Sequence, residues 1–534
     1  MTAFGITVLG GLGLSIADAH AHTIGERYDL PLPLLYFVIG AGAAVALSFA
    51  AAAIVLRPGA HRQRAWVVMS ETGARAPLAR VVRLVLQVFG LAVFALAIAA
   101  GLLGDQHPAR NIAPSIVWIG WWVGLAAFAA LIGNLWPLLN PWRTLFLWFG
   151  GRATAPPRAV PQRPIPQRWR AWPAVALLLG FVWFELIFPF GASPLAIAVA
   201  ALGYAALMLF GMARYGEAWL GRADAFTVLF DLLGRFAPVR AEATPAGTRL
   251  VLRFWGGGIA GDPPLSLSMT AFTLLALAAV LFDGFLGTSV WRAIDRAFGS
   301  LWGPRFDDDS LIAATVSLIG LWLVFLGAYL GTMALTAKLV GAARRTNGRT
   351  EGRTEGRMWA QRYAATLIPI AVGYHVAHNF AYLLVQGQAA LILTGDPFGR
   401  GWNLFGLAGR EPDITVVGAE GSWLAALLAI VGGHLIAVYV AHRIALAELA
   451  SARKAFAALI PLTALMVVYT CISLTVIAEP LTRFRAPDPS YSAVTATLIA
   501  FGATSKIYEL RDDAWTVVDK MSPQSCRIFS SAEI

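Results

Sequence analysis

The chain has 534 residues, of which 58% are hydrophobic and only 13% are charged, and its formal net charge is +11. Soluble domains carry about 25% charged residues, so this composition excludes a soluble domain and indicates an integral membrane protein. The positive residues gather in short loops between apolar segments, as is usual in membrane proteins, so the charge does not indicate nucleic-acid binding.

The N-terminus has the features of an export signal. Residues 4–16 are a short apolar stretch, and the Ala-Asp-Ala sequence at 17–19 fits a cleavage site, which predicts a signal segment at 1–19. Cleavage there would make His20 and His22 the first and third residues of the mature chain. A free amine followed by such histidines chelates Cu(II) or Ni(II), because its nitrogens close fused rings around a square-planar ion. If the signal is retained or cut elsewhere, these are ordinary loop histidines.

Ten apolar segments follow the signal. A membrane-spanning helix needs about 20 consecutive apolar residues. Residues 20–480 therefore predict an all-α, polytopic transmembrane helix bundle of about ten spans. The expected spans are 33–56, 82–104, 114–137, 172–190, 194–213, 266–289, 310–335, 364–390, 421–441 and 455–478.

Arginine-rich connections alternate with connections that are short or less basic. If ten helices alternate from an external N-terminus, all the arginine-rich connections lie on one side, and an excess of Arg and Lys marks the cytoplasmic side. This predicts a multi-pass protein of a bacterial inner membrane with a periplasmic mature N-terminus. The basic connections are 57–81, 141–171, 214–265 and 336–363, and the opposite ones are 105–113, 191–193, 290–309 and 391–420.

Four segments outside the spans have distinctive sequences that predict their local structure. The longest cytoplasmic connection, 214–265, has an amphipathic stretch followed by a β-like run, TRLVLRFW. The repeat GRTEGRTEGR at 348–357 predicts a solvated linker. The sequence Asn-Pro-Trp-Arg at 140–143 is expected to end and anchor the third span. Residues 481–534 lose the hydrophobic pattern and form a C-terminal tail to which we assign no structure.

Four of the eight histidines lie in or at the edge of two apolar segments near the C-terminal end. His375 and His378 are three residues apart on one helix and share a face. His434 is expected at a similar depth on the next helix. His442, eight residues further on, lies about 12 Å closer to the cytoplasmic edge, since an α-helix rises about 1.5 Å per residue. Ionisable groups inside a bilayer are rare and usually mark a functional site.

Two carboxylates accompany the outer histidines. Glu185 and Asp283 each lie a turn or two from the outer end of an outward-running helix. Imidazoles and carboxylates together are ligands for transition metals, and a metal with an open position generates hydroxide near neutral pH. The sequence therefore predicts a divalent metal ion (Zn, Mn, Co or Cu) held by His375, His378 and His434, with Asp283 and Glu185 as catalytic carboxylates.

Other interpretations of these residues remain open. Histidines on two facing helices also ligate haem b. A buried transmembrane histidine often only hydrogen-bonds across helices or relays protons. The alternative role for Glu185 and Asp283 is to extend to the membrane interface.

Several strings of the sequence are distinctive when taken together and in order. They include DQHPARNIAPSIVWIGWWVG, ARYGEAWLGRADAFTVLFDLLGRFAP, LFDGFLGT, YHVAHNFAYLLVQGQ and GGHLIAVYVAHRIAL. In this combination, residues 20–475 resemble the bacterial multi-pass proteins of the membrane-bound fenitrothion hydrolase family. The resemblance supplies no catalytic residues, so the site assignment rests on the residues discussed above.

The resemblance implies hydrolysis of an organophosphorus triester with release of a nitrophenol. It also implies a heterodimer with a second, related membrane subunit. A small apolar triester would partition into the lipid bilayer, where the histidines lie, and its hydrolysis suits a metal-activated hydroxide. The alternative hypothesis is a copper-binding or copper-handling membrane protein, indicated by His20 and His22.

Overall fold

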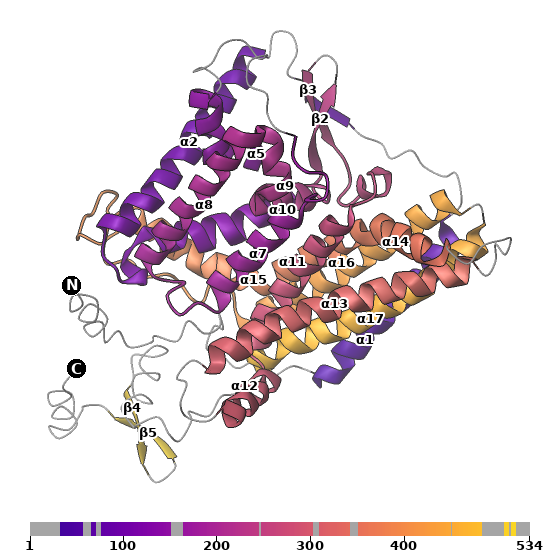
Figure 1. Ribbon diagram of the computed structural model, residues 1–534. Helices are drawn as coiled ribbons and strands as arrows, with labels where there is room; N and C mark the ends of the chain where they lie inside the picture. The colour runs from indigo at the N-terminus through magenta and orange to yellow at the C-terminus, as the bar shows by residue number, and fades with distance from the viewer. Residues whose placement is uncertain are drawn as a thin grey trace.

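The computed structural model is a bundle of long helices (Figure 1). It describes residues 32–56, 66–70, 76–150, 164–244, 247–302, 309–341, 351–449, 451–482, 507–511 and 514–518. The predicted signal segment at 1–19, with His20 and His22, lies outside the described residues. Within them, nine helices are long and apolar enough to cross a membrane. The chain is thus an all-α, polytopic membrane protein, as the sequence predicts.

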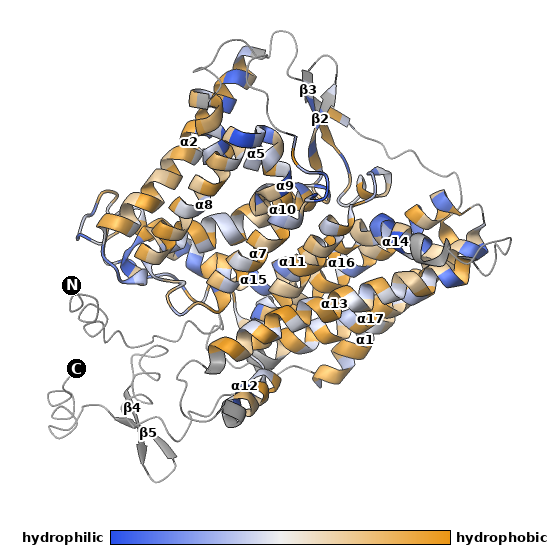
Figure 2. Cartoon of the chain, in the orientation of Figure 1, coloured by the Kyte–Doolittle hydropathy of each residue, from blue (hydrophilic) through white to orange (hydrophobic). Residues whose placement is uncertain are grey.

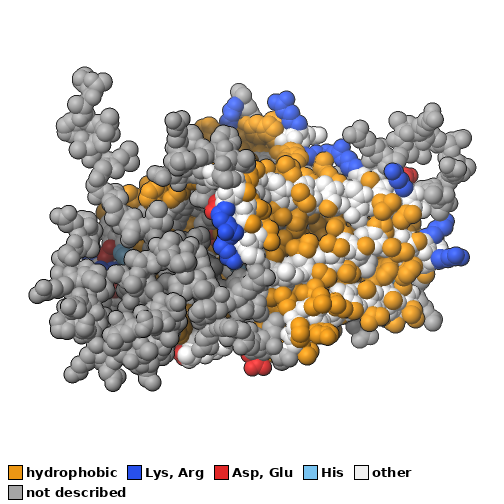
Figure 3. Space-filling view, turned by 90° about the horizontal axis from the view of Figure 1, so that it is seen from below, with side chains coloured by type: hydrophobic (Ala, Val, Ile, Leu, Met, Phe, Trp, Pro, Cys, Tyr) orange, Lys and Arg blue, Asp and Glu red, His pale blue; other side chains and the backbone are white. Residues whose placement is uncertain are grey.

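The nine helices coincide with nine of the ten predicted spans. They are α1 (Leu34–Val55), α2 (Ala76–Leu103), the run α3, η3 and α4 (Ile112–Pro114, Ser115–Leu125, Ala126–Leu131), α8 (Pro194–Tyr215), α11 (Leu267–Leu286), α13 (Asp309–Gly341), the run α14, η7 and α15 (Glu351–Tyr363, Ala364–Leu367, Ile368–Leu393), α16 (Ala419–Glu448) and α17 (Ala452–Thr482). Hydrophobic residues run along their length (Figure 2) and form a broad band over one flank of the bundle (Figure 3). This outward apolar surface is what a helix in contact with lipid requires.

The tenth predicted span, 172–190, forms the shorter helix α7 (Trp172–Leu186), which has 15 residues. The Ala171 amide donates to Ser268 Oγ at one end of α11, with an N–O distance of 3.0 Å, and Glu185 interacts with Asp283 near its other end. Helix α7 therefore runs parallel to α11 through the bundle. It buries Ala174, Val175, Leu178 and Val182, whereas Trp172, Ala176 and Gly180 on another face of the helix are exposed.

Shorter elements connect the long helices. They are η2 (Pro108–Arg110), α5 (Trp136–Leu139), α6 (Pro141–Leu145), η4 (Phe146–Gly150), η5 (Glu217–Trp219), α9 (Leu220–Ala223), α10 (Ala225–Gly234), η6 (Ile259–Gly261) and α12 (Ser289–Trp302). Helix α12 occupies the expected connection 290–309. The repeat at 348–357 is not wholly a linker, because its residues from Glu351 onward begin α14. That helix is held against α13 by a hydrogen bond of 2.8 Å from the Tyr329 hydroxyl to the Ala360 carbonyl.

Two distant connections meet in a small antiparallel sheet of order β1-β3-β2. Strand β1 (Trp66–Ser70) comes from the connection between α1 and α2, whereas β2 (Val239–Thr244) and β3 (Gly247–Leu252) come from the connection before α11. Strand pairing requires these two connections to lie on the same side of the bundle. A separate hairpin of β4 (Ile507–Arg511) and β5 (Ala514–Val518) lies in the tail at 481–534.

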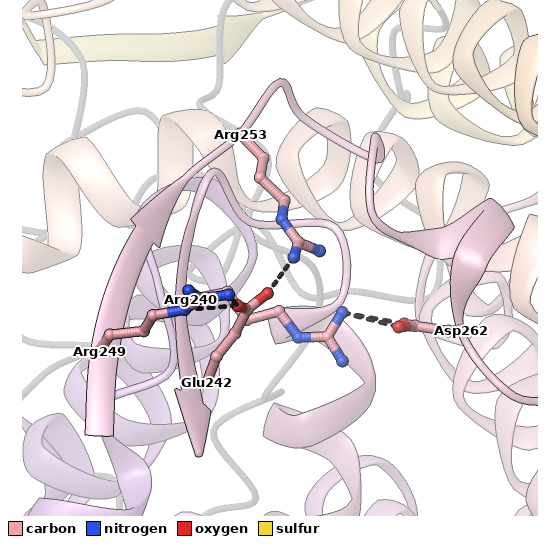
Figure 4. A network of polar contacts seen from close by, with 5 residues as sticks. All are labelled: Arg240, Glu242, Arg249, Arg253 and Asp262. Atoms are coloured by element: carbon pink, nitrogen blue, oxygen red, sulfur yellow. Dashed lines mark hydrogen bonds and ion pairs between the residues drawn. The ribbon is translucent and has the colours of Figure 1, made fainter. Parts of the chain in front are cut away.

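Ion pairs tie the sheet to the loop that follows it (Figure 4). Glu242 on β2 accepts hydrogen bonds from Arg249 on β3 and from Arg253 just after β3. Arg240 on β2 donates to both carboxylate oxygens of Asp262, at 2.8 and 3.1 Å. Side chains from three segments thereby fix the loop that leads into α11.

Asp224, the N-cap residue of α10, is fully buried and joins three segments of the chain. Its oxygens accept five hydrogen bonds of 2.7–3.1 Å, from Asn140 Nδ2, Trp142 Nε1, Tyr204 Oη, Thr227 Oγ1 and the Phe226 amide. Burial raises the pKa of this carboxyl, and the hydrogen bonds from Thr227, Tyr204 and Trp142 oppose that rise. The residues at 140–143 thus anchor the chain to α10 and α8, as expected, but they do not end the third span, which stops at Leu131 before α5.

Helices α15 and α16 approach closely at two glycines. A Cβ on Gly373 would lie 2.4 Å from the Ala429 carbonyl oxygen and 3.3 Å from the Gly433 Cα. A Cβ on Gly433 would lie 2.5 Å from the Pro369 carbonyl oxygen. Small residues permit such close backbone contact between transmembrane helices. This contact also fixes the register of the two helices that carry the intramembrane histidines.

We expect Gly373→Ala to destabilise the protein by about 2 kcal/mol, because the added methyl group forces the two backbones apart. The measurement is unfolding in mixed micelles titrated with a denaturing detergent. Gly387→Ala on the same helix is the matched control, since nothing lies within 4 Å of its Cβ position. Equal stabilities of the two variants would contradict the importance of this contact.

Candidate functional site

An imidazole–carboxylate pair lies in the interior of the bundle. His378 Nε2 on α15 is 2.7 Å from Asp283 Oδ2 on α11. The two side chains are 17% and 25% exposed, so they are enclosed but not sealed off. An ionised carboxylate can only accept a hydrogen bond, so Nε2 donates, and in the neutral imidazole Nδ1 then carries the lone pair. The pair joins two residues that the sequence analysis assigned to different roles, one as a metal ligand and one as a catalytic carboxylate.

A second carboxylate and two aromatic residues surround this pair. Glu185, near the end of α7, interacts with the charge of Asp283 and with the Trp122 indole on η3. Tyr382, one helical turn beyond His378, interacts with both carboxylates. The structure therefore brings Glu185, Asp283 and His378 into one polar cluster.

Tyr374 lies on the other side of His378, one turn earlier on α15. Their rings are nearly parallel, at an interplanar angle of 14° and a centroid distance of 6.2 Å. The Tyr374 hydroxyl and His378 Nδ1 approach the same point, because a Cβ on Gly284 would be 3.0 Å from the former and 3.7 Å from the latter. Gly284, the residue after Asp283, thus lets the Tyr374 hydroxyl, His378 Nδ1 and the Val476 side chain approach the backbone of α11.

His375 does not join the cluster. Its Nε2 lies 3.2 Å from the Val123 carbonyl oxygen, and its Nδ1 lies 3.4 Å from Asn379 Nδ2. Val123 belongs to η3, which is a π-helix. On an α-helix, positions three residues apart point about 60° apart, so His375 faces η3 while His378 faces α11. Both ring nitrogens of His375 already have protein partners, which gives this residue a structural role.

His434 also faces away from His378. Its Nδ1 lies 2.8 Å from the Ile430 carbonyl oxygen of its own helix, and its ring contacts Tyr469 on α17 at a centroid distance of 5.9 Å. The contact between Gly373 and Gly433 sets its level near that of Tyr374, about one turn from His378 along α15. The expected common depth of the three histidines is therefore only approximate.

The predicted ligand set of His375, His378 and His434 is thus not formed. The three imidazoles contact three different elements, η3, α11 and α17. In the part of the chain that the structure describes, no group of three or more His, Cys, Asp or Glu side chains is arranged to hold a metal ion. A site for Zn, Mn, Co or Cu built on these histidines does not fit the geometry.

Three aromatic residues of the cluster were not identified from the sequence. Tyr374 and Tyr382 lie four residues before and four residues after His378, so all three share one face of α15. That four-residue spacing is the sequence feature that could have identified both tyrosines as neighbours of His378. Trp122 has no such signal, because nothing in the sequence indicates that η3 lies beside α7.

The cluster is suited to proton transfer. A carboxylate that accepts from one imidazole nitrogen orients the ring and stabilises the imidazolium that forms when the other nitrogen takes a proton. A general base of this kind activates water or another hydroxyl compound.

Comparison of the chain with models of protein families, with curated proteins and with solved structures found no match.

Proposed function

We propose that this chain is a hydrolase of small apolar organophosphorus triesters, such as aryl phosphorothioates, embedded in a bacterial inner membrane with a periplasmic N-terminus. The observation that carries the proposal is the 2.7 Å contact between His378 Nε2 and Asp283 Oδ2. Such a pair is one of the standard arrangements for activating a nucleophile by general-base catalysis. The substrate class comes from the family resemblance.

The proposed reaction uses water as the nucleophile. Asp283 accepts the Nε2 proton of His378 and orients the ring, and Nδ1 takes a proton from water as the water oxygen attacks phosphorus. The Tyr374 hydroxyl, beside Nδ1, donates a hydrogen bond to the sulfur or oxygen on phosphorus. The P–O–aryl bond breaks and the aryl oxide leaves, taking up the proton held by His378. The products are a dialkyl phosphorothioic acid and a nitrophenol.

Two properties of the bundle support an apolar substrate. Its outer surface is apolar along the spanning helices, so a neutral triester that partitions into the bilayer is concentrated beside it. The partial exposure of His378 and Asp283 leaves both side chains within reach from outside the bundle. A charged substrate would have to lose much more hydration to reach the same pair.

The test is hydrolysis in water labelled with ¹⁸O. The protein is purified in mild detergent together with any second subunit, since the resemblance implies a heterodimer, and is reconstituted in nanodiscs with an aryl phosphorothioate triester. We expect nitrophenolate absorbance to rise and the label to enter the phosphorus product. Label in the nitrophenol would indicate attack at the aromatic carbon, and either that result or an absence of nitrophenol would contradict the proposal.

A further inference from the structure

The core between α15, α16 and α17 contains buried polar atoms that have no hydrogen-bond partner among the described residues. They are the hydroxyls of Tyr374, Tyr469 and Ser473 and Nε2 of His434. All four side chains are at most 8% exposed. Buried polar groups are nearly always paired with protein or with ordered water. The Tyr469 and Ser473 hydroxyls also interact with each other, so internal water between the helices is required chiefly at the Tyr374 hydroxyl and at His434 Nε2.

These atoms form a series that begins at the His378–Asp283 pair. The Tyr374 hydroxyl lies beside His378 over Gly284 and interacts electrostatically with Tyr469. The Tyr469 ring contacts that of His434, and Ser473 lies one turn further along α17. Each member thus lies near the next, although the members come from three helices.

Apart from Ser473, the series also advances in one direction across the membrane. Ser473 lies back toward the outer pair, because Val476, further along α17, approaches Gly284. Tyr374 is four residues inward of His378, or about 6 Å along the axis of α15. Gly373 contacts Gly433, which brings His434 close to the level of Tyr374. His442 lies eight residues further inward on α16, about 12 Å from His434. Its side chain is 1% exposed and its Nδ1 also has no hydrogen-bond partner among the described residues.

We propose that this series and the water between its members form a proton path from the His378–Asp283 pair to His442. Imidazole, phenol and hydroxyl groups each accept a proton on one side and release one on the other, as in membrane proton relays. One proton enters at the outer pair and one leaves near the cytoplasmic end of α16, with no change in oxidation state. The path is independent of the proposed hydrolase, in which the proton taken up by His378 leaves with the aryl oxide.

The test measures proton flux without any organophosphorus substrate, so its result does not depend on the hydrolase. Proteoliposomes with the full chain hold the dye pyranine inside, and valinomycin with equal potassium on both sides keeps the potential at zero. After an external acid jump, we expect internal pH to fall about tenfold faster than in protein-free liposomes. Tyr374→Phe and Tyr469→Phe each remove one hydroxyl and preserve shape, and we expect both to return the rate close to the protein-free value.

The control is Tyr439→Phe on α16, because the Tyr439 side chain is 38% exposed and does not belong to the series. It should conduct like the unmodified chain. Flux no faster than through empty liposomes would overturn the proposal. So would equal flux in the unmodified chain and the two path variants, or an equal loss in Tyr439→Phe.

Discussion

Replacing His378 with alanine is expected to lower kcat for aryl triester hydrolysis about 10³-fold, with little change in KM. The substitution removes the group that takes the proton from water, whereas the apolar surface that binds the substrate remains. His378 is partly exposed, so its loss should leave a folded protein in the membrane. Nitrophenolate absorbance in nanodiscs gives both constants.

Asp283→Asn tests the same pair from its other side. An amide can donate to Nε2 and so favours the wrong tautomer of the imidazole, for which we expect a loss of about 10²–10³-fold in kcat. The control is His107→Ala, because His107 lies in an exposed loop and its Nδ1 accepts a hydrogen bond only from the nearby Ala109 amide. Full activity in His378→Ala, or an equal loss in His107→Ala, would remove His378 from the mechanism.

The spanning helices could be predicted because the signal for them is local. An apolar run such as Leu34–Val55 must form a helix in a bilayer, because only a helix hydrogen-bonds all the backbone groups of a single segment within that segment. The segment at 172–190 is also helical, but helix α7 ends at Leu186 and is shorter than predicted. Hydropathy measures the length of an apolar run, but it does not tell where the helix within that run ends.

The candidate site could be predicted only in part, because it depends on the directions of side chains between helices. The intramembrane positions identified His378, Asp283 and Glu185, which the structure brings together. The sequence could not reveal that a π-helix presents the Val123 carbonyl to His375. It also could not reveal that Gly373 and Gly433 set a register in which His434 faces α17. Shared depth is therefore a necessary condition for a ligand set but not a sufficient one.

The contacts of Asp224 could not be predicted either, because they are long-range polar contacts without a local sequence signal. In the sequence it is one acidic residue of an amphipathic stretch, and its partners Asn140 and Trp142 lie more than 80 positions away. Propensity identifies an aspartate here as a helix N-cap. It does not identify the other two segments that the same carboxylate holds.

We expect Asp224→Ala to lower the free energy of unfolding by roughly 4 kcal/mol, because it leaves several buried donors unpaired and removes the cap of α10. Asp224→Asn should cost less, since one oxygen still accepts. Detergent titration monitored by tryptophan fluorescence measures both losses. Asp231→Ala on the same helix is the control, because the Asp231 side chain is exposed and accepts a hydrogen bond from Asn134 alone among the described residues. If Asp224→Ala proved no less stable than Asp231→Ala, Asp224 would be an ordinary helix cap and not the residue that joins α6, α8 and α10.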